Sequence, residues 1–167
     1  MQPAEERIIV LGLGSEILTD DGLPLRLIRD LKKELNIPGI TYRDANTGGL
    51  DLLDHLDGFD KAVIIDTIMT RDGKPGTVYT FTPEKNYRES LHLSSYHDAA
   101  FPVALRLGSV LELDMPDELW IIAVEVVEGL EFGANSSRRI QAGYPLILEE
   151  VSRAVSTIVT ETVYSVL

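Results

Sequence analysis

The chain has 167 residues, no cysteine, and 27 acidic against 15 basic residues, for a formal net charge of -12 at pH 7. The absence of cysteine excludes disulfides, thiolate metal sites and a cysteine nucleophile, while the negative charge opposes binding to nucleic acid and to anionic membranes. A single globular domain over residues 1–167 is expected from this length and from an apolar fraction of 44%.

Short apolar runs alternate with helical patterns in the first half of the chain. Buried strands are predicted at Ile8–Leu11, Ile40–Tyr42 and Ala62–Ile65, where β-branched residues gather between turn residues. Apolar residues recur in steps of three and four from Leu27 to Leu35, which predicts an amphipathic helix. A short helix is expected at Leu50–Leu56.

The second half of the chain repeats this alternation. Residues 78–82 alternate in character and predict a half-exposed edge strand. A helix is expected after Asp98, and Leu119–Val126 predicts another buried strand. Ser136 can cap a long last helix, and Pro145 should kink it.

The order of these elements predicts the fold class. Strands that alternate with helices form a mostly parallel sheet covered on both faces. We therefore expect an α/β fold: a three-layer α/β/α sandwich whose twisted, mostly parallel sheet has one antiparallel edge strand.

The sequence also predicts a cytoplasmic protein that is a monomer or a small oligomer, with a monomer expected. The first seven residues are too acidic for the positively charged start of a signal peptide, and the apolar run Ile8–Leu13 is too short for its core. No stretch approaches the 18 apolar residues that suggest a membrane span.

Residues that can carry chemistry gather where the predicted strands end. Parallel strands place these ends at one edge of the sheet, which is where open α/β sheets bind ligands. The candidates are Ser15, Glu16, Asp20, Asp21, Asp44, Asn46, Thr47, Asp66, Thr67, His92, His97, Glu128 and Glu131. Such a set can bind a divalent cation or transfer protons.

Structural roles remain open for several of these residues. Asp20 or Asp21 could cap the helix that follows, and Asp66 could accept a hydrogen bond in a turn. His97 could be the partner of a backbone carbonyl. Glu131, like Glu128, could be a solvated loop charge.

The pair Gly12 and Gly14 after the first strand allows a different interpretation, a dinucleotide-binding turn with Asp44 on a ribose. Against it, Ile17 occupies the position of the third glycine. Asp20 and the residue after it would also oppose a pyrophosphate at the start of the helix. Neither a G-x-S-x-G turn nor an H-E-x-x-H helix is present.

Five segments together resemble the maturation endopeptidases of nickel–iron hydrogenases. Residues 9–22 are similar to the opening G-x-G-N-x-L-x-x-D-[DE]-G signature of that family, and residues 44–49 are similar to its D-G-G-T-x-G loop. Asp66 matches the aspartate of the third strand, residues 75–78 match a P-G-T-hydrophobic edge strand, and residues 95–98 match an S-x-H segment. The order and spacing agree from about residue 8 to residue 159.

The resemblance implies an endopeptidase that removes the C-terminal extension of a hydrogenase large-subunit precursor after nickel insertion. It implies that Asp21, Asp66 and His97 contact the metal, with Asp21 and Asp66 as the catalytic carboxylates. Nickel would be carried by the substrate as a recognition element, and cadmium or zinc could replace it in vitro. The alternative is a nucleotide- or cofactor-binding α/β module without protease activity.

Two positions differ from the family pattern. Ser15 replaces the usual asparagine, and Ala45-Asn46 replaces the two glycines after Asp44. Alanine does not enter positive φ as glycine does, so the second change could alter the backbone beside the cleft.

Overall fold

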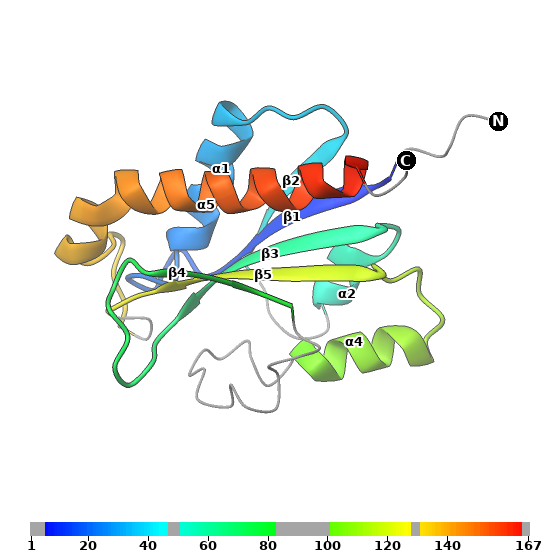
Figure 1. Cartoon of the computed structure of the whole chain (residues 1–167). Coiled ribbons are helices and arrows are strands. Elements are labelled where there is room, and N and C mark those ends of the chain that lie inside the picture. Colours follow the sequence, from blue (N-terminus) through cyan, green and yellow to red (C-terminus); the bar gives the residue numbers. More distant parts are fainter. Residues whose placement is uncertain (1–5, 47–50, 83–100, 128–130, 165–167) are drawn as a thin grey trace.

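The computed structural model describes residues 6–46, 51–82, 101–127 and 131–164, which form a five-stranded sheet with helices on both faces (Figure 1). The strands are β1 (Ile8–Leu13), β2 (Ile40–Ala45), β3 (Lys61–Ile68), β4 (Val78–Phe81) and β5 (Glu118–Glu125). The helices are α1 (Leu23–Glu34), α2 (Asp51–Leu56), α4 (Phe101–Val110) and α5 (Arg138–Tyr164). Each strand and helix expected from the sequence is present, with its ends shifted by a few residues.

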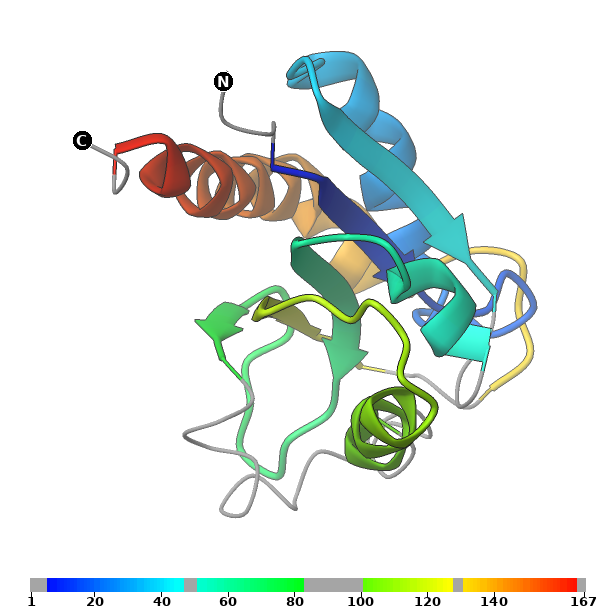
Figure 2. The ribbon, with the colours of Figure 1, turned by 90° about the vertical axis from the view of Figure 1, so that its right-hand side faces the viewer.

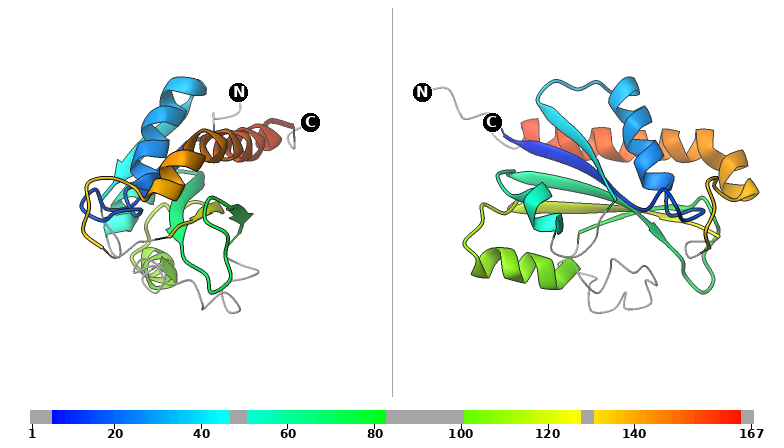
Figure 3. Two further views of the ribbon diagram at one scale, coloured as in Figure 1. Left: turned by 90° about the vertical axis from the view of Figure 1, so that its left-hand side faces the viewer. Right: turned by 180° about the vertical axis from the view of Figure 1, so that it is seen from behind.

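The strand order is β2-β1-β3-β5-β4. β1 pairs in parallel with β2 and β3, and β3 pairs in parallel with β5, whereas β4 pairs antiparallel with β5. This arrangement confirms the expected sheet with one antiparallel edge strand (Figure 3). The order also reverses between β1 and β3, because the chain adds β2 on one side of β1 and the later strands on the other. Open α/β sheets bind their ligands at such a reversal.

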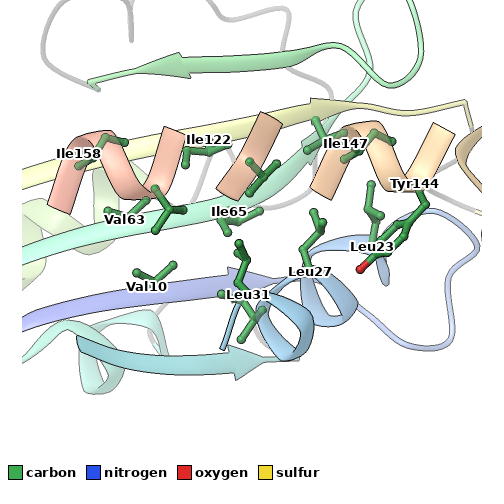
Figure 4. Close-up of a cluster of buried hydrophobic side chains, with 14 of the residues drawn as sticks. Val10, Leu23, Leu27, Leu31, Val63, Ile65, Ile122, Tyr144, Ile147 and Ile158 are labelled. Atoms are coloured by element: carbon green, nitrogen blue, oxygen red, sulfur yellow. The ribbon is translucent and has the colours of Figure 1, made fainter. Parts of the chain in front are cut away.

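One face of the sheet is covered by α1 and α5 (Figure 2). Side chains of alternate strand residues, such as Val10, Val63 and Ile65, point to this face and pack against both helices. Figure 4 shows this core, with Leu23, Leu27 and Leu31 of α1 and Tyr144, Ile147 and Ile158 of α5. Burial of this apolar surface joins the two helices to the sheet and to each other.

The opposite face carries α2 and α4 (Figure 2). Leu52, Leu53 and Leu56 of α2 pack against Ile9, Leu11 and Ile64 of the sheet, and Leu107 of α4 packs beside them. Val110, the last residue of α4, and Leu111 after it are exposed. Helices on both faces confirm the three-layer architecture.

The starts of the two long helices differ from expectation. α1 is capped at Gly22, so neither Asp20 nor Asp21 caps it. α5 begins at Arg138, and the carbonyl of Ser137 accepts its first helical hydrogen bond, from the Gln141 N–H at 2.9 Å. Ser137 thus takes the position that was expected for Ser136.

α5 is a single helix that continues through Pro145.

None of the helices in the described ranges combines the length and the apolar character that crossing a membrane requires.

β1 and α1 approach so closely that glycine is required at two positions. A Cβ atom on Gly12 would lie 2.5 Å from Ile28 Cγ1 and 2.6 Å from the Pro24 carbonyl oxygen. A Cβ atom on Gly14 would lie 2.0 Å from the carbonyl oxygen of Asp21. The two glycines therefore let the loop between β1 and α1 fold tightly against the end of the strand, which gives the G-x-G pattern a structural cause.

The first prediction follows from this contact. We expect Gly14→Ala to lower the free energy of unfolding by about 1–3 kcal/mol, because the added methyl group must displace the Asp21 backbone. Urea denaturation measures the change. Gly143→Ala is the control, because its Cβ would lie 3.8 Å from Ile147 Cδ1, an ordinary contact. Equal stability of Gly14→Ala and the parent protein would show that the loop can move without cost.

Candidate active site

β3 extends beyond β1 at the carboxyl edge of the sheet, and Asp66 lies in this extension. The last residue of β3 that pairs with β1 is Ile65, opposite Gly12. From Asp66 to Ile68 the strand pairs only with β5 among the described strands. Asp66 is therefore inside the strand, not at its end as the sequence suggested. The missing pairing on the β1 side leaves room for the loop that contains Asp21.

Thr67 links Asp21 and Asp66. Its backbone N–H donates to Asp66 Oδ1 at 2.7 Å, and its hydroxyl donates to Asp21 Oδ1 at 3.1 Å. Both aspartates are buried, with exposed fractions of 6% for Asp21 and 9% for Asp66. The fold thus brings together two of the three residues that the sequence singled out as metal-contacting, from segments 45 positions apart in the chain.

Ionised carboxylates that lie near one another repel, and a cation bound between them removes that repulsion. Carboxylate oxygens are suitable ligands for divalent ions. Within the described ranges, no group of three or more His, Asp and Glu side chains is arranged to hold a metal. The third predicted ligand, His97, lies outside the described residues, as do His92, Thr47 and Glu128.

Asp20 has a different role from Asp21. Its side chain is fully buried, accepting the backbone N–H of Ser137 at 2.6 Å and that of Val127 at 3.2 Å. These bonds join the β1–α1 loop to the segment between β5 and α5. The sequence allowed a capping role for Asp20 but contained no sign of these distant partners.

Glu125 is a buried carboxylate that sequence reasoning missed. It accepts the Thr70 backbone N–H at 2.6 Å and the Thr70 hydroxyl at 2.9 Å. Burial and the adjacent Glu125 raise the pKa of Tyr79 above its usual value. Glu125 therefore anchors the loop that follows β3. A single charged residue inside the apolar run Leu119–Val126 was the signal that could have revealed it.

Arg29 of α1 connects two of the loops at this edge. Its guanidinium donates to Glu16 at 2.5 Å and to Asp44 at 3.0 Å. Asp44, considered above as a ribose ligand, therefore already has a partner within the chain. Ala45 ends β2, and its carbonyl accepts the Gly14 N–H at 3.2 Å. It is not among the described residues with positive φ, so glycine is not required there.

The other predicted positions lie around this centre. Ser15 donates its backbone N–H to the Asp21 carbonyl at 3.2 Å. Glu131 is exposed, and its carbonyl accepts the Thr19 N–H at 2.9 Å. Asn46 is also exposed.

Comparison with known proteins identifies relatives of one kind. The family described as hydrogenase maturation protease (HycI) matches residues 25–155. The hydrogenase 2 maturation protease of Escherichia coli is 26% identical over 155 residues, covering 89% of this chain and 90% of that protein. The hydrogenase expression/formation protein HupM of Azotobacter chroococcum is 24% identical over 149 residues, covering 85% of this chain and 68% of that protein.

Solved structures share the fold. The hydrogenase maturating endopeptidase HybD from E. coli superposes with a TM-score of 0.73 at 24% identity, covering 90% of this chain and 93% of that one. A [NiFe] hydrogenase maturation protease HybD from Thermococcus kodakarensis has a TM-score of 0.67 at 25% identity, covering 89% and 98%.

The contacts of Asp20 yield a second prediction. Asp20→Asn replaces one acceptor oxygen with an NH2 group that faces a backbone donor. We expect the free energy of unfolding to fall by about 1–3 kcal/mol, the cost of leaving a buried group unpaired. Chemical denaturation measures it, with the exposed Asp72→Asn as the control. A variant as stable as the parent would mean that these two hydrogen bonds contribute little to stability.

Proposed function

This chain belongs to the hydrogenase maturation protease family, and from that premise we propose that it is the endopeptidase that removes the C-terminal extension of a nickel–iron hydrogenase large-subunit precursor. The family membership agrees with the resemblance that the order of sequence motifs indicated.

The observation that carries the proposal is the contact of Asp21 and Asp66 with the same residue, Thr67. Hydrogen bonds from Thr67 orient both carboxylates at the edge where the strand order reverses. A pair of oriented, buried carboxylates can act on a cation, a water molecule or both. Asp20 and Glu125 anchor loops, so we assign Asp21 and Asp66 as the acidic groups of the proposed centre.

Asp21 and Asp66, together with His97, are proposed to contact nickel that the precursor carries. The metal is then part of the substrate, and the enzyme completes its coordination only in the complex. Such an ion supplies positive charge that polarises a carbonyl oxygen or a water. A carboxylate of the pair could serve as the base that takes a proton from the attacking water. Cadmium or zinc could stand in for nickel in vitro.

The third prediction tests the role of Asp66. Asp66→Asn keeps the size of the side chain but removes its charge, and we expect cleavage of nickel-loaded precursor to slow by about 10²-fold or more. Intact-mass measurement of the large subunit before and after incubation reports the loss of the extension. Nickel-free precursor should remain uncut by the parent enzyme.

Asp117→Asn is the control, because Asp117 is exposed and lies just before β5, at the opposite edge of the sheet. It changes the net charge by the same amount and should leave cleavage unchanged. Cleavage of nickel-free precursor, or full activity of Asp66→Asn, would contradict recognition through the metal while leaving the protease assignment in place.

The fourth prediction concerns His97. We expect His97→Ala to weaken the binding of nickel or cadmium to the enzyme at least about tenfold, the loss of one good ligand. Isothermal titration calorimetry measures the affinity. His55→Ala is the matched control, since it removes an imidazole that is not part of the proposed site. His55 lies on α2, with its Nδ1 3.5 Å from Arg43 Nη1. Equal affinities for His97→Ala and the parent would remove His97 from the metal site.

A further inference from the structure

A groove of about 580 Å³ opens beside the proposed active site, between the starts of α1 and α5. Its walls come from the β1–α1 loop, α1, the segment before α5 and α5 itself. Gly22, the residue that follows Asp21, lines it. The volume lies within the range of about 300–1,000 Å³ that ligand pockets occupy. The groove thus begins one residue from a proposed catalytic carboxylate.

The groove is polar and contains two arginines whose situations differ. Arg29 is held by Glu16 and Asp44, as described above. Arg26 stacks on the ring of Tyr144, with its guanidinium carbon 3.6 Å from the ring centroid. Its ion pair with Asp30 is long, at 4.0 Å. Arg26 is therefore a fixed cation whose donor groups can still bind a carboxylate from another molecule.

An apolar pair of residues, Leu18 and Phe132, lies beside the groove. Leu18, which lines the groove, forms an isolated antiparallel bridge with Phe132. Hydrogen bonds from Thr19 N to the Glu131 carbonyl and from Gly133 N to the Ile17 carbonyl flank this bridge. In such a pair the two side chains lie on the same side. Phe132 is nevertheless 83% exposed, so the backbone at this position is fixed while little covers its large apolar ring.

The charges near the groove are unusual for this acidic chain. Four of its 15 basic residues lie on the first two turns of α1 and the first turn of α5: Arg26, Arg29, Arg138 and Arg139. Positive side chains at the start of α5 oppose the helix dipole, so they do not serve the stability of that helix. An anionic group bound there would be attracted by the side chains and by the helix start together.

From these contacts we infer that the groove binds the C-terminal extension of the precursor, as an extended peptide with an acidic group at Arg26 and an apolar side chain on Phe132. This inference rests on the proposed function. Exposed aromatic and arginine side chains are the residue types that dominate binding energy at interfaces. The acidic group is either the terminal carboxylate, which every C-terminal extension possesses, or an Asp or Glu side chain within it.

The test compares cleavage kinetics of variants on the nickel-loaded precursor. Arg26→Gln and Phe132→Ser should each raise KM about tenfold and leave kcat within twofold, because they weaken binding away from the reacting groups. Arg26→Lys keeps the positive charge, so its KM should rise less than that of Arg26→Gln. Arg153→Gln and Leu111→Ser, at exposed positions elsewhere, should keep the parental KM. Thermal unfolding of each variant verifies that it is folded.

A synthetic peptide with the sequence of the extension identifies the acidic group. If the free-acid peptide inhibits the parent enzyme about tenfold more strongly than the peptide with a C-terminal amide, the terminal carboxylate is the ligand of Arg26. If the two peptides inhibit equally and Arg26→Gln weakens both, the ligand is an acidic side chain of the extension. Parental KM values for both Arg26→Gln and Phe132→Ser would overturn the inference while the proposed function stands. Failure of the parent enzyme to shorten the nickel-loaded precursor would instead overturn the proposed function.

Discussion

The close approach of β1 and α1 is the constraint on which the site depends. Gly12 and Gly14 leave no side chain between the strand and the helix start, so the connecting loop folds back until the Ser15 N–H bonds the Asp21 carbonyl. The loop is thereby held against the end of β1. Asp20 and Asp21 then enter the protein interior side by side, pointing to different partners. A pattern that suggested a nucleotide-binding turn thus serves to place carboxylates.

Four buried carboxylates near the carboxyl edge divide into two kinds. Asp20 and Glu125 accept backbone N–H groups of distant segments, and each anchors a loop. Asp21 and Asp66 meet at Thr67, where the strand order reverses. A buried charge is costly unless hydrogen bonds or a counter-charge stabilise it. Hydrogen bonds within the fold stabilise both pairs, and the second pair is the one that we propose contacts the cation of the substrate.

The groove between the helix starts contains two arginines and lies next to the loop that carries Asp21. Its arginines are arranged differently: Arg29 holds loops together, and Arg26 is braced on Tyr144. Tyr144 in turn donates to Asp30 at 2.6 Å, and burial and the adjacent Asp30 raise its pKa. The tyrosine is therefore neutral at physiological pH, and the stack fixes α5 to α1.

The sequence by itself determined the strands, the helices, the class of sheet and the family. Hydrophobic periodicity is a local property, and runs such as Ile8–Leu11 and Ala62–Ile65 could be recognised without knowing their neighbours. The spacing of the motifs was enough to indicate Asp21 and Asp66. Only the tertiary structure decided which carboxylates are buried and what they bind. Asp20 meets Ser137 across 117 positions, and Glu125 meets Thr70 across 55, because hydrogen-bond partners are selected by the packing of distant segments.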